Sequence, residues 1–233
     1  NNTSANNQVV TVALSGAVKG LPQIKISTSS VAFGSVALTQ TKSDSIIFTN
    51  IGDDILNITA KVTGGDSSNF TIAPSASNIA VAQSGVFNVK FSPTSFGSKT
   101  SAISFTANDT VYRVFSVNVS GASPLPTLAT NIPSVSFGNV GIGIATQKLK
   151  ITNSSVNQLI IDSIYTGTSR FAASVKSANV KDSLIIDVTF KPDSIRGYVD
   201  TLYLRNNSAT SLVKIPMNGN VPYPTLLVSV PSI

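Results

Sequence analysis

A repeat with a period of about one hundred residues constrains this chain more than any other feature. The segment Val31-Ala32-Phe33-Gly34-Ser35-Val36 returns as Val135-Ser136-Phe137-Gly138-Asn139-Val140, and the segment 89–93 returns as 188–192. Short periods of 20 to 50 residues are typical of solenoids, in which each repeat packs only on its neighbours. A period of domain length instead predicts whole domains in tandem.

The closing segments of the repeats extend the pattern toward both ends of the chain. Residues 117–121 align with 214–219, and both resemble residues 10–16. We therefore expect a terminal strand within 1–20 that resembles the last strand of a repeat, domains at 21–122 and 123–221, and the start of a further repeat within 222–233. The end segments fit a window cut from a longer array, or strands that add to the open edge of a neighbouring molecule.

Composition favours an all-β fold. The 233 residues contain no Glu, and the strong helix formers are few beside Val, Ile, Thr, Ser, Asn and Gly. Apolar residues alternate with polar ones in short runs that are separated by turn residues. We predict two tandem immunoglobulin-like β-sandwich domains of seven to eight strands each, a fold of about 100 residues per domain.

The expected strands follow from this alternation. They lie at 24–26, 31–36, 45–49, 56–62, 70–72, 86–91, 100–106 and 112–119, and again at 144–152, 159–165, 171–175, 184–190, 198–204 and 212–217. Phe33, Phe91, Phe137 and Phe190 occupy corresponding places in the two repeats, so we interpret them as core residues.

The missing residue types exclude many reactions. Cys and His are both absent, so the chain has no disulfide, thiol nucleophile, thiolate ligand or imidazole base. Asp53 and Asp54 are interpreted as turn residues and not as calcium ligands, which would need six or more converging oxygens. Gly138, Gly141 and Gly143 precede no helix and indicate a strand bulge, not a phosphate loop. We expect no enzyme activity, no cofactor and no metal site.

The formal charge of +6 is dispersed along the chain. A nucleic-acid-binding protein usually gathers Lys and Arg on one surface with stacking aromatic residues, and no such grouping is visible in the sequence. No segment approaches the 18 to 20 apolar residues that span a bilayer. We expect that the chain does not bind nucleic acid and that it has no membrane-spanning segment.

Two proline-rich segments flank the second repeat. Ser123-Pro124-Leu125-Pro126-Thr127 joins the repeats, and Val221-Pro222-Tyr223-Pro224-Thr225 follows the second one. Alternate prolines stiffen a chain toward an extended geometry and remove backbone donors. The domains should therefore be held in line, as in a rod or spacer.

Several motifs together resemble a known family. Val-x-Phe-Gly-x-Val at 31–36, Phe-Thr-Asn-Ile-Gly-Asp at 48–53, Val-x-Phe-Ser-Pro-Thr at 89–94 and Val-x-Val-Ser-Gly at 117–121 occur in the order and spacing of the ASH or hydin-like repeat. Similar repeats in bacterial surface proteins are called choice-of-anchor D domains. The resemblance covers about 200 residues and implies a non-enzymatic immunoglobulin-like module, used in cytoskeletal and ciliary scaffolds or on bacterial surfaces.

A shorter pattern bears on location. Asp is followed by Ser or Thr and an aliphatic residue at six of the ten Asp positions, where composition predicts roughly one or two. The triplet resembles the O-glycosylation acceptor of secreted Bacteroidota-type proteins, and it is also how a polar turn enters a strand. The candidate acceptors are Ser45, Thr110, Ser163, Ser183, Ser194 and Thr201.

These observations favour a secreted structural protein, at a bacterial cell surface or outside the cell. It would build a rod, layer or filament with itself or with other surface proteins, and it could carry covalent glycans. An adhesion or carbohydrate-binding module is an alternative, although the five Tyr form no obvious group in the sequence. A spacer of a larger secreted enzyme is another. An intracellular scaffold agrees less well with the low-charge, Glu-free composition.

Overall fold

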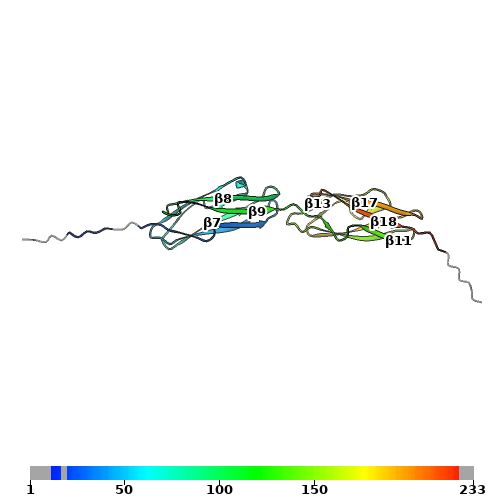
Figure 1. Ribbon diagram of the computed structural model, residues 1–233, viewed down its shortest axis with the longest axis horizontal. Helices are drawn as coiled ribbons and strands as arrows, with labels where there is room; N and C mark the ends of the chain where they lie inside the picture. The colour runs from blue at the N-terminus through cyan, green and yellow to red at the C-terminus, as the bar shows by residue number, and fades with distance from the viewer. Residues whose placement is uncertain (1–11, 17–19, 226–233) are drawn as a thin grey trace, which may run out of the picture.

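A computed structural model describes residues 12–16 and 20–225, and these form two β-sandwiches arranged end to end (Figure 1). The first sandwich spans β1 to β9 and the second spans β10 to β18. Each pairs a four-stranded sheet with a five-stranded sheet. The predicted all-β fold with two immunoglobulin-like sandwiches is confirmed.

The two sandwiches have the same topology. In the first, the sheet orders are β1-β3-β7-β5 and β2-β9-β8-β4-β6; in the second they are β10-β12-β16-β14 and β11-β18-β17-β13-β15. The bounds of the strands of the first sandwich are Ile24–Ile26, Ser30–Ser35, Lys42–Asn50, Leu56–Thr63, Phe70–Ala73, Ala76–Ile79, Ser84–Phe91, Gly97–Ala107 and Val114–Ser123, with a 3-10 turn at Ser67–Asn69. Those of the second are Ala129–Thr130, Val135–Asn139, Ala145–Thr152, Leu159–Thr166, Phe171–Ala173, Ala178–Val180, Ser183–Phe190, Gly197–Asn206 and Leu212–Asn220.

Each sandwich has nine strands in the described residues, where we expected seven to eight. The first strand of each is divided, because the chain pairs antiparallel in one sheet and then crosses to pair parallel with the last strand of the other sheet. A short strand also extends each five-stranded sheet, namely β6 and β15. The strands β6, β10, β11 and β15 are absent from the expected strands. For β10 and β15 the reason is that two or three residues carry no readable alternation.

The glycine of the repeated Val-x-Phe-Gly motif lies at a bulge. Gly34 and Gly138 have φ angles of 69° and 62°. The parallel pairing shifts register at these residues, between Ala32 and Ser35 in one sandwich and between Ser136 and Asn139 in the other. A positive φ costs little only for glycine. The bulge interpretation of Gly138 is therefore correct.

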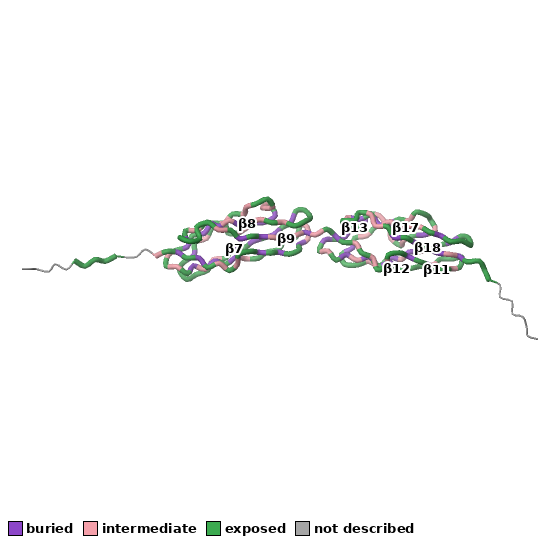
Figure 2. The backbone as a smooth tube through the Cα atoms, viewed as in Figure 1, coloured by how far each residue is buried: buried purple, intermediate pink, exposed green. Residues whose placement is uncertain are grey.

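Each sandwich has its own core, as the pattern of burial in Figure 2 shows. Phe33 and Phe91 stack with ring centroids 5.6 Å apart, and Phe137 and Phe190 meet at 5.3 Å. All four are buried, which confirms their interpretation as core residues. The closing glycine of the repeat, Gly121 or Gly219, lies against the ring of Phe91 or Phe190, and a Cβ there would overlap that ring.

The end segments are only partly within the described residues. Residues 12–16 and 221–225 form no strand, and Val12 and Leu14 are exposed. The rest of the terminal segments expected to resemble strands, residues 1–11, 17–19 and 226–233, lies outside the described part of the chain. In the described residues no helix is long and apolar enough to cross a membrane.

Candidate functional site: the joint between the sandwiches

The joint is built on the linker Ser123–Thr127, which runs from the end of β9 to β10 (Figure 1). Ser123 and Pro126 are buried, so the linker is packed against the sandwiches and not free in solvent. Proline at 124 and 126 fixes the backbone φ angle near −65° at two alternate residues. The backbone is therefore stiff where the two sandwiches meet.

A turn of the second sandwich holds the linker through Asn153. This side chain is 6% exposed, and its Oδ1 accepts from the backbone N–H of Thr127 at 3.0 Å and from that of Ser155 at 3.1 Å. Its Nδ2 donates to the carbonyls of Asn157 at 2.8 Å and Lys181 at 2.9 Å. It also donates to the carbonyl of Val180 at 3.3 Å, so one buried amide satisfies five backbone groups, as buried polar groups require.

Asn157, the fifth residue of the same turn, bridges the two sandwiches. Its Oδ1 accepts from the backbone N–H of Leu38, in the β2–β3 loop of the first sandwich, at 2.8 Å. Its Nδ2 donates to Ser123 Oγ at 3.0 Å and to the carbonyl of Pro124 at 2.8 Å. The side chain is 7% exposed, so water competes little for these bonds. A single neutral amide therefore joins a loop of one sandwich, the linker and a turn of the other.

The first sandwich repeats this turn without its bridge. Asn50 is fully buried, and its Nδ2 donates to the carbonyls of Asp54 at 2.7 Å and Ile79 at 3.1 Å. Its Oδ1 accepts from the backbone N–H of Gly52 at 3.1 Å. Asp54 occupies the place of Asn157, and its Oδ1 accepts from the N–H of Ile55 at 2.7 Å. Asp53 and Asp54 are thus turn residues, as predicted.

A buried carboxylate closes the same end of the first sandwich. Asp109 is 1% exposed and accepts from the backbone N–H groups of Ile24 at 2.7 Å, Val111 at 2.7 Å and Tyr112 at 3.1 Å. Burial alone would raise the pKa of Asp109, but the N–H groups of Tyr112, Val111 and Ile24 together lower it below its ordinary value. This ionised group ties β1 to the β8–β9 loop.

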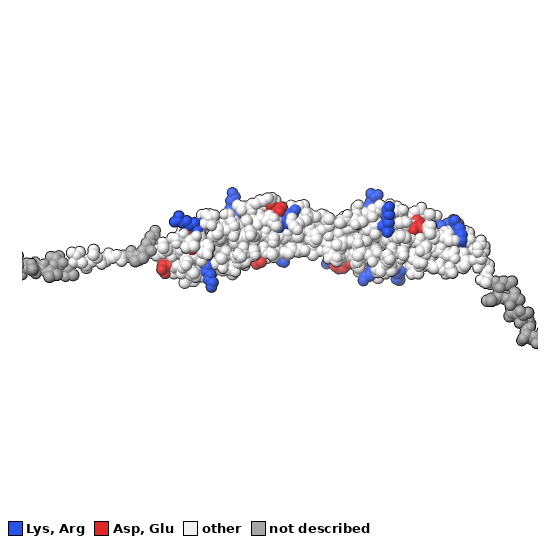
Figure 3. All heavy atoms as spheres, in the orientation of Figure 1, with Lys and Arg blue, Asp and Glu red and all other residues white. Residues whose placement is uncertain are grey.

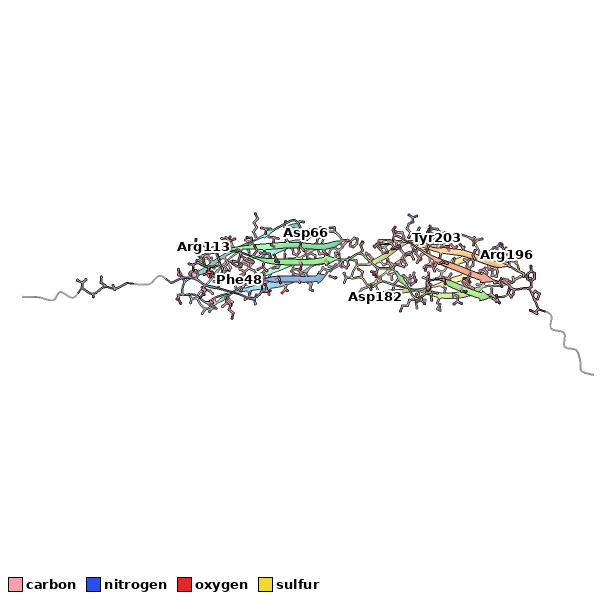
Figure 4. All side chains as sticks on the ribbon, in the orientation of Figure 1. Phe48, Asp66, Arg113, Asp182, Arg196 and Tyr203 are labelled. Carbon is pink, nitrogen blue, oxygen red and sulfur yellow. The ribbon has the colours of Figure 1, made fainter. Side chains whose placement is uncertain are left out.

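The opposite end of the molecule carries a polar cluster around Tyr198. The Tyr198 hydroxyl donates to Asp193 Oδ1 at 2.7 Å, and Arg170 forms an ion pair with Asp193. The hydrogen bond from Tyr198 lowers the pKa of Asp193, burial opposes this, and Arg170 adds to the lowering. The guanidinium of Arg196 lies 4.4 Å from the Tyr198 ring centroid. Figure 4 places Arg196 at the end of the second sandwich that is far from the joint.

The candidate O-glycosylation residues occupy different environments. Thr110, Ser183 and Ser194 are exposed, and Ser194 Oγ hydrogen-bonds to Asp193 at 3.3 Å. Ser45, Ser163 and Thr201 are half-buried within strands. The six residues are not brought together at one place.

The aspartates of these triplets have structural partners in four cases. Asp109 and Asp193 are described above, and Asp44 accepts from the N–H of Ser45 at 2.8 Å. Asp200 accepts from the N–H groups of Gly167 at 2.9 Å and Thr168 at 2.8 Å. Turn and loop hydrogen bonding therefore accounts for much of the Asp-Ser/Thr pattern, and the glycosylation of the following hydroxyls stays a prediction.

The fold groups aromatic residues that are scattered in the sequence. Tyr165 on β13 pairs with Tyr203 on β17, and the rings stack at 4.9 Å with an angle of 11°. Tyr165 is 44% exposed, so this pair forms a flat aromatic surface on the second sandwich. Sequence reasoning missed the pair because the two residues lie on strands that are separated in the chain. Within the described residues no three acidic side chains come together as a cation site.

Charged side chains are dispersed over both sandwiches, as Figure 3 shows for one face. Lys148 pairs with Asp187 at 2.9 Å, and both side chains are largely in solvent. An exposed pair of this kind contributes little to stability. The visible face shows no concentrated basic surface.

Comparison with known proteins supports the predicted family. Residues 22–113 match the family model ASH, "Abnormal spindle-like microcephaly-assoc'd, ASPM-SPD-2-Hydin". The resemblance to the ASH or hydin-like repeat is thus confirmed for this part of the first sandwich. Comparison with curated proteins gives no match.

Several solved structures are similar at low identity. A protein of unknown function from Porphyromonas gingivalis W83 is 12% identical, covering 85% of this chain and 99% of that one, with a TM-score of 0.38. The ASH/PapD-like domain 7 of human CEP192 is 15% identical over 48% of this chain and 96% of that domain, with a TM-score of 0.37. The CsuC–CsuE chaperone and tip adhesion subunit complex of Acinetobacter baumannii is 10% identical, covering 84% of this chain and 98% of that one, with a TM-score of 0.37.

Proposed function

We propose that this chain is a non-catalytic structural segment whose two sandwiches form a rigid rod in a secreted cell-surface structure, layer or filament. The bridge made by Asn157 carries the proposal, since it fixes one sandwich on the other through three short hydrogen bonds. The in-line arrangement in Figure 1 supports the same function. A spacer between other parts of a larger secreted protein, including an enzyme, would use the same rigidity.

The proposed units are residues 21–122 and 123–221, each with its own core. Residues 1–20 and 222–233 would then be parts of neighbouring repeats or strands shared between molecules. Limited proteolysis tests these limits, because exposed connections without hydrogen-bonded strands are cleaved first. We expect stable fragments that begin near residue 20 and end near residue 225. Early cleavage within 123–127 would contradict the packed joint.

An extracellular location is proposed from the six Asp-Ser/Thr-aliphatic triplets. If the natural protein is glycosylated there, the exposed residues Thr110, Ser183 and Ser194 should be modified most completely, because a transferase must reach the hydroxyl. Intact-mass and peptide mass spectrometry of protein from its natural source measures the occupancy. Unmodified peptides at all six positions would remove this support.

Strand addition between molecules is a proposed route of assembly. In the first sandwich β2 pairs with β9 only from Asn118 onward, and the earlier part of β9 borders a hollow of about 400 Å³ that is lined by Ile24, Ile26 and Phe115. In the second sandwich the matching stretch of β18 carries Lys214 and Pro216, which are typical protections of a sheet edge.

Assembly by this route can be blocked at β9. The variant Ser116→Pro removes one backbone donor from the part of β9 that pairs with β8 but not with β2, and we expect it to reduce filaments seen by electron microscopy. Ser104→Ala on the neighbouring strand β8 is the control, because it leaves the backbone donors of β9 intact. Filaments of unchanged length and number in Ser116→Pro would contradict strand addition at this edge.

Adhesion is a second candidate function, because the fold forms the stacked pair Tyr165–Tyr203 on an accessible face. The flat rings of such a pair can contact the apolar face of a ligand while the tyrosine hydroxyls remain hydrated. Glycan-array binding that is lost in Tyr165→Ala and kept in Tyr112→Ala would support adhesion. A chain that binds no glycan leaves the structural function as the proposal.

Electron microscopy and small-angle scattering of the natural protein test the structural proposal. Filaments or sheets with a repeat set by two in-line sandwiches would support a self-assembling structure. A particle whose two sandwiches take many relative angles would overturn the proposed rod, whatever its state of assembly.

A further inference from the structure

The outer end of the second sandwich repeats the donor half of the joint. At the joint, Val36 N–H donates to the carbonyl of Ala122 at 2.8 Å, and Leu38, two residues later, gives its N–H to Asn157. At the outer end, Val140 N–H donates to the carbonyl of Asn220 at 2.9 Å. Ile142, two residues later, is 66% exposed. Pro222 follows here as Pro124 follows at the joint.

We name this end the C-pole, made of residues 140–144, 195–196 and 221–225. A hollow of about 490 Å³ lies at the C-pole. It is lined by the loop after β11, by Ile195 in the loop before β17 and by the linker-like segment 221–225. Two of the differences from the joint change the polar groups that are available. Val221 replaces Ser123, so the hydroxyl acceptor is lost. Arg196, whose carbonyl accepts from Val221 N–H at 3.0 Å, stands where the first sandwich has Gly97 opposite Ser123.

The outer end of the first sandwich, the N-pole, repeats the acceptor half. It consists of residues 20–23, 50–54 and 108–113, and a hollow of about 580 Å³ lies among them. The turn has the same buried asparagine as at the joint, but its fifth residue is Asp54. A carboxylate accepts hydrogen bonds and donates none. Asp54 therefore cannot make the two bonds that Asn157 Nδ2 makes to Ser123 and Pro124.

The changes at the two poles compensate each other in part, because the carbonyl of Pro222, in the place of the Pro124 carbonyl, receives no donor from Asp54. The N-pole has lost an amide donor and gained a negative charge at Asp54. The C-pole has lost the hydroxyl acceptor of Ser123 and gained the guanidinium of Arg196, which lies over the ring of Tyr198, while Ile142 corresponds in position to Leu38. A carboxylate facing a backbone N–H and a guanidinium forms charge-assisted bonds, which are stronger than neutral ones. Arg113 also lies at the N-pole (Figure 4), so the match rests on the position of Asp54 and not on net charge.

From this match we infer that the C-pole of one chain docks on the N-pole of a second copy, with Asp54 in the place that Asn157 has at the internal joint. The internal joint is neutral, whereas the joint between copies is ionic. The inference deepens the proposed structural function, because it names the surface by which rods add head to tail. Association through it should weaken as salt screens the charges.

Cysteine cross-linking tests the docking, since the chain has no cysteine of its own. One full-length variant carries Ile51→Cys in the N-pole turn, and the other carries Gly141→Cys in the C-pole loop, where an added Cβ meets no atom within 4 Å. After mixing and mild oxidation we expect the 51–141 disulfide to exceed the 51–51 and 141–141 products. Adding Asp54→Ala to the first variant, or Arg196→Gln to the second, should lower the mixed product by about fivefold, as for a contact of roughly 1 kcal/mol.

The matched control is Asp162→Ala, which removes the same charge from an exposed position on β13. It should leave the mixed product unchanged. A statistical mixture of the three disulfides, or a yield that does not depend on Asp54, would overturn the inference. Small-angle scattering of single copies separates the two proposals. If single copies stay in line while cross-linking is statistical, the rod stands and head-to-tail docking fails.

Discussion

The turns at 50–54 and 153–157 share one asparagine and differ in their fifth residue. Asn50 and Asn153 are both buried and satisfy the backbone of their turns in the same way. Asn157 hydrogen-bonds to the other sandwich, whereas Asp54 accepts a hydrogen bond from the next residue in its own sandwich, Ile55. The first position of the turn therefore stabilises the sandwich itself, and the fifth position can connect it to a second sandwich.

Removing the shared asparagine should have the largest effect. Asn50→Ala leaves the carbonyls of Asp54 and Ile79 without their donor, and Asn153→Ala does the same to three carbonyls of the second sandwich. Unsatisfied buried groups cost about 1–3 kcal/mol each, so we expect losses of about 3 kcal/mol or more. Hydrogen exchange with mass spectrometry assigns the loss to one sandwich. Equal loss in both sandwiches from one variant would contradict separate cores.

The stability of the first sandwich should depend on pH in the original chain more strongly than in a variant without the Asp109 carboxylate. The pKa of Asp109 is lowered in the folded state, so the stability that it contributes is present above the unfolded pKa of about 3.9 and is lost as the pH falls through the folded value. Asp109→Asn should destabilise the first sandwich at pH 7 and flatten its dependence on pH below about 4.

Thermal unfolding followed by hydrogen exchange at neutral and acid pH measures this change. The second sandwich also has a lowered pKa at Asp193, but that group is exposed and solvent screens its contribution. In the unaltered chain the first sandwich should therefore lose more stability in acid than the second sandwich does. A variant with the same acid sensitivity as the original would exclude Asp109 as the cause.

Changing Asn157 should act on the joint and leave both cores folded. Asn157→Asp keeps the acceptor for Leu38 N–H and removes the donor to Ser123 and Pro124, which reproduces the situation of Asp54. We expect the free energy that couples the two sandwiches to fall by about 1–3 kcal/mol. The difference in unfolding free energy between the full chain and variants with one sandwich already unfolded measures it. Asn88→Asp, at an exposed position on β7, is the matched control and should leave the coupling unchanged.

The smallest effect is expected from Ser123→Ala. Asn157 Nδ2 then keeps the carbonyl of Pro124 as an acceptor, so the loss should be about 0.5–1.5 kcal/mol, the value of one hydrogen bond. The same coupling measurement applies. A loss as large as that of Asn157→Asp would show that the hydroxyl, and not the carbonyl, is the main partner.

Much of the fold could be predicted from the sequence, because alternation and turn residues are local signals. The strand Ser84–Phe91 alternates visibly, and its Phe91 recurs as Phe190. The two pieces of the first strand in the first repeat were predicted, at 24–26 and 31–36. Their assignment to different sheets was not visible, since it depends on pairing with a last strand about 90 residues away. The bulge at Gly138 was predictable because only glycine is common at positive φ.

The joint could be predicted only in part. The alternate prolines of 123–127 indicated a stiff linker, and the packed linker agrees with this. The role of Asn157 was invisible, because its partner Leu38 lies 119 residues away in sequence. Asn-rich turns are common in such a chain, and nothing local marks one asparagine as a bridge. Alignment of the two repeats could have pointed to it, since Asp54 occupies the matching position.

Residual dipolar couplings of the full chain show whether Asn157 holds the two sandwiches in one fixed orientation. We expect the couplings of both sandwiches to fit a single alignment tensor, and Asn157→Asp to split them into two tensors of different magnitude. Two different tensors in the unaltered chain would contradict the fixed joint.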